Sequence, residues 1–118
     1  MPELPAHSEL SSAIRRDRDG VRLVLRGELD MNGVLEAERA VEAAAAATRG
    51  KLTIDLSELD FMDLFGARSL LRAADAAVSA ERRVVIANPN RHVRRLFELI
   101  TDLARGRSLV AELVRTQD

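Results

Sequence analysis

The sequence predicts an α/β domain in which strands and helices alternate along the chain. Two hydrophobic patterns carry this prediction. Apolar residues alternate with polar ones in short segments such as 21–30 and 51–59, which is typical of strands. Elsewhere apolar residues recur every three or four positions, which is typical of helices. The predicted order is β β α β α β α followed by a tail, and this alternation implies parallel pairing with right-handed crossovers.

The opening segment is predicted to be a hairpin. Residues 1–9 form a loose leader with two prolines, and residues 10–17 form the first strand. The sequence DRDG at 17–20 favours a turn, because Gly20 can adopt a positive φ angle. Residues 21–30 form the second strand, which can pair antiparallel with the first across this turn.

Residues 31–50 are predicted to form the first helix, followed by a strand at 51–59. The alanine-rich composition of the first segment favours helix, and Gly50 is its expected stop. In the strand, apolar residues share one face and polar residues the other. The apolar stripe of the helix consists of Val34, Ala37, Val41 and Ala44.

The second half of the chain repeats the alternation of helix and strand. A turn at 63–66 leads into the second helix, and residues 82–88 form a short apolar strand. The third helix begins near Pro89, and residues 106–118 form a helix or a tail. The inward-facing residues of these two helices are predicted to be Leu70, Leu71, Ala74, Ala77 and Val78 in the second and Val93, Leu96, Phe97 and Ile100 in the third.

Length and composition limit the possible functions. The 118 residues predict one domain, spanning 1–118. The net charge of −1 and the aromatic content of 3% argue against general nucleic-acid binding, which normally shows a basic surface or aromatic stacking platforms. The absence of cysteine excludes disulfides and thiolate metal sites. Without a signal peptide or a long apolar run, the sequence predicts a cytoplasmic protein that does not enter the membrane.

No pattern in the sequence indicates an enzyme. The chain contains no HExxH, GxSxG, P-loop or GxGxxG motif. Its two histidines, His7 and His92, have no metal-binding partner at helical spacing, and His92 is interpreted as a solvated or core-edge residue. We therefore predict no catalytic residue, no cofactor and no metal ion.

Several charged residues remain open to two interpretations. Asp30, Asp55, Asp60 and Asp63 follow or end predicted strands, where an α/β fold can place a site. Capping and turn formation is the simpler interpretation, and it is preferred for Asp55 and Asp60. Asp63 can cap the second helix and can also face a partner. The basic run at 91–95 is interpreted as a solvated helix face, with a docking patch for an acidic partner as the alternative.

Three segments together resemble the STAS domain, and more specifically the bacterial anti-sigma factor antagonists. They are GELD at 27–30, KLTIDLSELDFMDLFGARSLL at 51–71 and VVIANPNRHVRRLFEL at 84–99. The resemblance covers residues 10–105. It implies a mixed sheet of four or five strands with helices mainly on one face. The usual last strand of this family is short or missing here.

The resemblance also implies a function. Such antagonists bind an anti-sigma factor, typically a GHKL-type serine kinase, and so regulate transcription that depends on a sigma factor. The kinase inactivates the antagonist by phosphorylating a Ser or Thr in a D-S-[ST]-G motif. Asp63 and Gly66 match the ends of this motif, whereas Leu64 takes the first serine position and Phe65 the phosphoacceptor position. Phenylalanine has no hydroxyl group, so the switch is absent at its usual place.

Three roles for Leu64 and Phe65 remain open. They can contact the partner of an antagonist that is never phosphorylated there, or they can join this chain to itself or to other STAS domains in a homodimer or a stressosome-like scaffold. Alternatively, one or both can pack in the core. Ser69, one helical turn after Phe65, is either a displaced phosphosite or an ordinary helix residue. The residues predicted to bind a partner are Asp30, Asp63, Leu64, Phe65 and Gly66.

Overall fold

The computed structural model describes residues 9–79 and 82–103 of the chain. The predicted order of strands and helices is confirmed, with a short 3-10 helix, η1, before the first α-helix. Most of the predicted leader and the predicted C-terminal helix or tail lie outside the described residues. The elements are β1 (Ser11–Arg16), β2 (Gly20–Leu29), η1 (Met31–Gly33), α1 (Val34–Ala46), β3 (Lys51–Met62), α2 (Leu64–Ala77), β4 (Val84–Ala87) and α3 (Arg91–Leu103).

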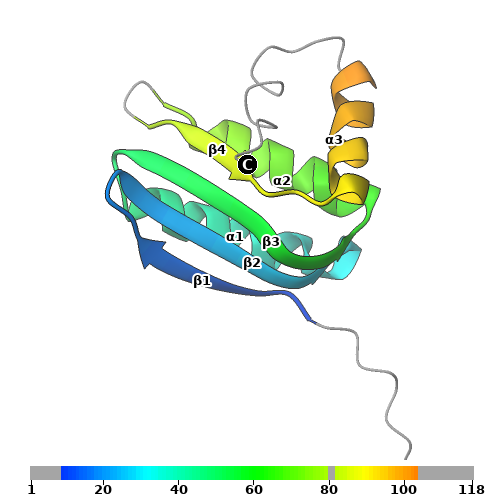
Figure 1. Ribbon diagram of the computed structural model, residues 1–118, viewed down its shortest axis with the longest axis horizontal. Coiled ribbons are helices and arrows are strands. Elements are labelled where there is room, and N and C mark those ends of the chain that lie inside the picture. The colour runs from blue at the N-terminus through cyan, green and yellow to red at the C-terminus, as the bar shows by residue number, and fades with distance from the viewer. Residues whose placement is uncertain (1–8, 80–81, 104–118) are drawn as a thin grey trace, which may run out of the picture.

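The described strands form one mixed sheet in the order β1-β2-β3-β4 (Figure 1). β1 pairs antiparallel with β2 across the predicted turn, in which the backbone amide of Asp17 donates to the carbonyl of Gly20 at 2.8 Å. The pairs β2–β3 and β3–β4 are parallel, as the intervening helices require. The described residues thus contain four strands, and any fifth strand after α3 would lie outside them.

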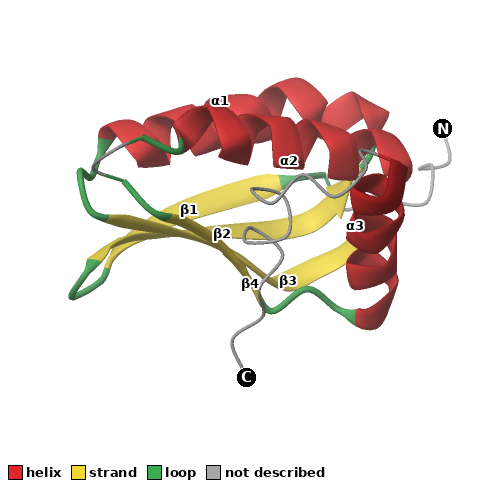
Figure 2. Cartoon of the chain, turned by 90° about the horizontal axis from the view of Figure 1, so that it is seen from above, coloured by secondary structure: helices red, strands yellow, loops and turns green. Residues whose placement is uncertain are grey.

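The helices lie mainly on one side of the sheet. Figure 2 shows α1 and α2 together over one face, with α3 at one end of the sheet. The alternating apolar residues of β2 and β3 point toward α1 and α2 and are buried, among them Leu23, Leu25, Leu52 and Ile54. The predicted apolar stripes of the three helices are confirmed except at Val34, which is half-buried outside the core. Val78 packs against the core just after the end of α2, and Phe97 of α3 is completely buried.

Helix α1 is shorter than predicted. It ends at Ala46, and the interpretation of Gly50 as its stop is wrong. Gly50 instead lies against the β1–β2 turn, where an added Cβ atom would be only 2.5 Å from the carbonyl oxygen of Asp19. Its backbone amide donates to the hydroxyl of Thr48 at 2.9 Å. This glycine therefore permits a close backbone approach just before β3, after the helix has already ended.

Strand β3 is longer than predicted and runs to Met62. The extra length pairs with the end of β2, where Leu29 lies opposite Met62, and at each of two register shifts β3 has one residue more than β2. Gly27 adopts a φ angle of 101° at the second shift. Asp60 therefore lies inside β3, as Asp55 does, and neither residue ends or follows the strand as predicted.

Candidate functional site

The junction between β3 and α2 is built by Asp63. Its extended backbone leaves the strand, and its side-chain Oδ1 accepts a hydrogen bond from the amide of Gly66 at 2.8 Å. Its own amide donates to the carbonyl of Leu29 at 3.2 Å, which joins the ends of β2 and β3. Asp63 is therefore the N-cap of α2, a position at which an aspartate stabilises a helix by satisfying a free amide.

Gly66 has a packing role at this junction. A Cβ atom at this position would lie 2.3 Å from the carbonyl oxygen of Leu29 and 2.8 Å from its side-chain Cγ. No side chain fits there without a shift of the backbone, so glycine allows α2 to start directly against the end of β2. Gly66 is buried, and it shapes the site without offering a side chain to a partner.

Leu64 and Phe65 point into solvent. Their exposed fractions are 40% and 58%, although most large apolar residues in the described part of the chain are buried. The alternative that places them in the core is wrong. The reason is the cap: Asp63 and Gly66 orient the first turn so that Ala67, Leu70 and Leu71 face the sheet instead. The two side chains are thus available for contacts outside this chain.

The sequence interpretation did not select two further exposed apolar residues. Met31 in η1 is 63% exposed and Leu35 in α1 is 56% exposed. They are one helical turn apart. A shallow depression of about 340 Å³, which we call the α1–α2 groove, brings Met31 next to Phe65. The residues that line it are Met31, Val34, Phe65, Arg68, Ser69 and Arg72.

Asp30 caps the neighbouring 3-10 helix. Its Oδ1 accepts a hydrogen bond from the amide of Asn32 at 2.9 Å, and its carbonyl accepts one from Gly33 at 2.9 Å. It is half-buried and lies beside a depression of about 320 Å³ that Glu9, Glu28 and Glu36 also line. The capping role of Asp30 is therefore visible, and it holds Met31 at the edge of the α1–α2 groove.

Ser69 lies on the floor of the groove and is only 4% exposed. Its hydroxyl donates to Glu38 Oε2 at 3.2 Å, which joins α2 to α1. A kinase needs an accessible hydroxyl, so this burial weighs against phosphorylation of Ser69 in the folded chain. The contact explains instead why a polar residue can occupy the helix–helix interface.

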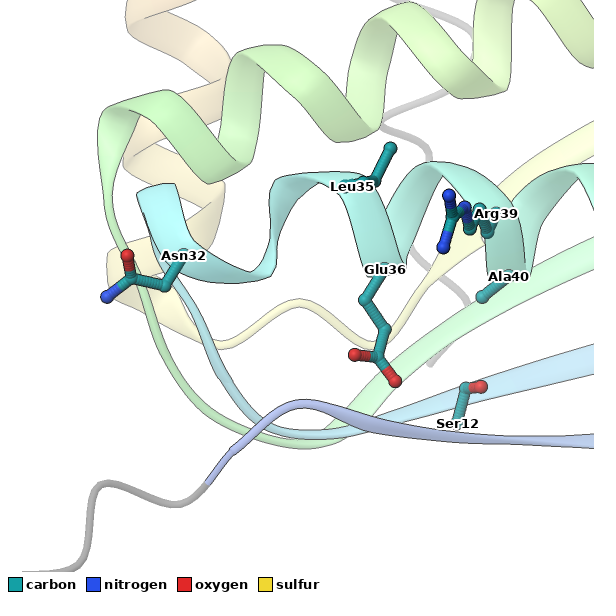
Figure 3. A pocket seen from close by; sticks show the side chains of 6 residues that line it. All are labelled: Ser12, Asn32, Leu35, Glu36, Arg39 and Ala40. Carbon is teal, nitrogen blue, oxygen red and sulfur yellow. The ribbon is translucent and has the colours of Figure 1, made fainter.

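A larger hollow of about 500 Å³ lies between α1 and the edge strand β1 (Figure 3). Glu36 points into it toward Ser12, and Leu35 also lines it. The residues lining the hollow include no histidine. Its geometry gives no reason to assign chemistry to it, and Leu35 lines this hollow and not the α1–α2 groove.

The start of α3 is attached to the end of β3. His92 Nε2 lies 3.1 Å from the carbonyl oxygen of Met62, and its ring stacks on Phe61 with 6.0 Å between the ring centroids. These contacts fit the interpretation of His92 as a residue at the edge of the core. The arginines of the predicted basic run, Arg91, Arg94 and Arg95, are exposed as expected for a solvated helix face.

Asp55 forms a polar cluster on the sheet face that carries Arg22. It is only 8% exposed, and Oδ2 accepts from Arg22 Nη1 at 3.0 Å. Its Oδ1 accepts from the amide of Ser57 at 2.9 Å and from Asn88 Nδ2 at 3.1 Å. Asn88 has a φ angle of 61°, in the left-handed region, so this contact holds an unfavourable backbone conformation before α3.

The surroundings of Asp55 lower its pKa below the usual value. Burial, the largest single effect, raises the pKa, but the hydrogen bonds from Ser57, Asn88 and Arg22 together outweigh it. A lowered pKa keeps the carboxylate charged, which suits a structural ion pair. Among the described residues, no three or more His, Asp or Glu side chains come together as a metal site would require.

The family model described as "Mlab, STAS domain" matches residues 12–111. The chain belongs to the STAS domain family. A comparison with curated protein sequences gives no match. No helix within the described ranges is long and apolar enough to cross a bilayer.

Solved structures share the fold of this STAS domain. An anti-sigma factor antagonist from Mycobacterium paratuberculosis has a TM-score of 0.71 at 23% identity, with 86% of each chain covered. The unphosphorylated anti-sigma factor antagonist SpoIIAA has a TM-score of 0.61 at 22% identity, with 92% of this chain and 89% of SpoIIAA covered. A protein from Thermotoga maritima described as an anti-sigma factor antagonist has a TM-score of 0.63 at 18% identity, with 91% and 86% covered. At these identities the likeness concerns the fold.

Proposed function

We propose that this STAS domain is a non-enzymatic binding module of the anti-sigma factor antagonist type. Its partner is an anti-sigma factor, a GHKL-type serine kinase, and its sequestration regulates sigma-dependent transcription in the cytoplasm. The observation that carries the proposal is the exposed ring of Phe65 at the start of α2, the position that the family resemblance gives to the phosphoacceptor. The fold that this domain shares with structures of anti-sigma factor antagonists also supports the proposal.

The proposal includes the loss of phosphorylation as a switch at position 65. A phosphate adds about −1.5 to −2 charges at neutral pH, and a helix N-terminus accommodates the anion without unfolding. The same charge would oppose an apolar partner surface. Phe65 cannot be modified in this way, so the domain is permanently in the form that binds. Aromatic side chains that fill a partner's pocket often contribute a large share of binding energy.

The partner surface proposed here joins the sequence-predicted residues to one that the structure adds. Leu64 and Phe65 supply apolar contact from α2, and Met31 supplies it from η1. Asp30 and Asp63 cap the two segments, and Gly66 lets them approach each other. These three residues hold the surface in shape, so their replacement should weaken binding through altered geometry.

The test is a pull-down from lysate of the source organism, with identification by mass spectrometry. Wild type is compared with Phe65→Glu, which places a negative charge where the family carries its phosphate. Leu99→Glu is the matched control, because Leu99 is 49% exposed on α3 and does not line the α1–α2 groove. We expect wild type and Leu99→Glu to retain a GHKL-type kinase and Phe65→Glu to lose it.

Two results would contradict the proposal. Retention of the kinase by Phe65→Glu would remove position 65 from the interface. Recovery of only this chain or other STAS proteins would favour a self-associating or stressosome-like scaffold. Sedimentation at increasing concentration separates these cases, since a scaffold domain self-associates and an antagonist of the proposed kind stays monomeric.

A further inference from the structure

The α1–α2 groove has an apolar part and a cationic part. Met31 and Phe65 form the first, and the side chains of Arg68 and Arg72 form the second. The two arginines follow Phe65 by three and seven residues, so all three lie on one side of α2. A ligand that contacts the Phe65 ring from this side therefore also meets two guanidinium groups.

The two arginines have no partner within residues 9–79 and 82–103. Arg22 and Arg26, in contrast, are engaged: Arg22 contacts Asp55, and Arg26 donates to Glu58 from Nε at 2.7 Å. Arg68 and Arg72 make no hydrogen bond or ion pair with any described residue, and both are exposed. Their donors are available to a carboxylate, which a guanidinium can bind with two parallel hydrogen bonds.

The polar group on the floor of the groove is not available to a ligand. Ser69 is buried and donates to Glu38, so its hydroxyl is already satisfied. Among the described residues, Glu38 is the carboxylate that hydrogen-bonds to a lining residue, and one of its oxygens accepts that bond. Val34 contributes only half-buried apolar surface. Recognition in the groove therefore depends on its rim, where the apolar and cationic side chains are exposed.

We infer that the partner of this surface presents an apolar side chain followed, about one helical turn away, by Asp or Glu. The inference rests on the proposed function for the position of the interface and adds the chemistry of the partner. The apolar side chain packs between Met31 and Phe65, and the carboxylate pairs with Arg68 or Arg72. Methionine adapts to varied apolar shapes, and opposite charges fix the register of docking.

A second copy of the chain fits this groove less well. A two-fold contact would place the same patch against itself. Arg68 and Arg72 of both copies would then lie in one interface without acidic partners from the groove rim. Like charges in one interface lower its stability. The acidic depression lined by Glu9, Glu28 and Glu36 lies outside the groove, so a two-fold contact would have to extend over both depressions to pair it with the arginines.

The test uses a displayed library of short random peptides selected at low salt against the full chain. We expect the selected peptides to combine an apolar residue with Asp or Glu. The double variant Arg68→Glu/Arg72→Glu should bind the selected peptide about tenfold more weakly or worse, and a synthetic peptide with Asn or Gln in place of its acids should weaken similarly. Binding should also fall toward about 0.5 M salt, where charges are strongly screened.

The matched control is Arg94→Glu/Arg95→Glu on α3. It makes the same change in net charge at exposed helix positions outside the groove, and we expect it to bind the peptide like wild type. Circular dichroism of both double variants confirms that they fold. Equal losses in the two double variants, selected peptides without acids, or no selection at all would overturn the inference.

This experiment separates the inference from the proposed function. If the kinase is lost on Phe65→Glu but retained by Arg68→Glu/Arg72→Glu, the antagonist function stands and the acidic partner chemistry fails. If no kinase is retained but the library still yields acidic peptides that depend on the two arginines, the partner chemistry stands and the antagonist function fails.

Discussion

The starts of α2 and α3 are built alike, and they present different residues to their surroundings. Each follows a parallel strand, and each begins at a capping side chain. Asp63 accepts from Gly66 at 2.8 Å, and Asn90 accepts from the amide of Val93 at 2.9 Å. The two residues after the cap differ: they are apolar in α2 and basic in α3.

Different contacts fix the two helix starts. The start of α3 is attached to β3 through side chains, since Asn88 contacts Asp55 and His92 contacts Met62. The start of α2 is fixed by its cap and by the close packing of Gly66, which leaves the side chains of Leu64 and Phe65 without a structural task. Because the first two side chains of α2 are not required to fix the start of the helix, they are free to bind a partner.

The largest expected effect separates two phenylalanines on these helices. Phe97→Ala should lower the free energy of unfolding by about 3–5 kcal/mol, because Phe97 is completely buried and its removal leaves a cavity. Phe65→Ala should change it by no more than about 0.5 kcal/mol, as for most surface positions. Urea denaturation followed by circular dichroism measures both. Similar losses would mean that Phe65 supports the fold.

The second effect concerns the close packing under α2. Gly66→Ala should cost about 1–3 kcal/mol, because its Cβ would overlap the carbonyl of Leu29 and the backbone must move. Gly33→Ala is the control, since a Cβ there would meet Leu10 and Leu29 at the ordinary distance of 3.5 Å. The same denaturation experiment compares them. An unchanged free energy of unfolding in Gly66→Ala would show that α2 can start elsewhere.

The third effect compares the two caps. Asp63→Ala and Asn90→Ala should each cost about 0.5–2 kcal/mol, because each removes an acceptor from a helix N-terminus. Only Asp63→Ala should also weaken binding of the kinase proposed as the partner, since it alters the turn that presents Phe65. Calorimetric binding and denaturation together measure this. Equal binding losses would contradict the division of roles between the two helices.

Much of this architecture was predictable from local pattern. The periods of two and of three to four identified the strands and helices, and the turn at 17–20 predicted the antiparallel hairpin. Asp63 and Asp30 were predicted as possible caps because their sequence positions allow it. The partner-binding role of the Phe65 region came from the family resemblance and stays a prediction.

The rest depended on contacts between distant segments. The extension of β3 to Met62 comes from pairing with β2, which no local pattern of β3 encodes. The role of Gly50 depends on Asp19, and the role of Asp55 depends on Arg22 and Asn88. The apolar Met31 directly after GELD was the available signal for the second half of the groove. Met31 contributes to the groove only because α1 and α2 pack side by side in the folded chain.

The smallest expected effect tests the polar cluster that ties the start of α3 to β3, and it concerns pH. The folded pKa of Asp55 lies below that of an ordinary aspartate, about 3.9 in an unfolded chain. Its contribution to stability is therefore fully present above that value and is lost as the pH falls through the lower folded pKa. Asp55→Asn should remove this part of the acid dependence.

The measurement is the free energy of unfolding from urea titrations between neutral pH and the acid range. Wild type should lose stability below about pH 4 more steeply than Asp55→Asn, whose amide does not titrate. Asp60→Asn is the matched control, because Asp60 is an exposed carboxylate of the same strand outside the cluster, and it should keep the steeper wild-type slope. Parallel profiles for wild type and Asp55→Asn would mean that the contacts from Arg22 and Asn88 do not favour the charged carboxylate. The start of α3 would then rely on its cap and its apolar face alone, as the start of α2 relies on Asp63 and Gly66.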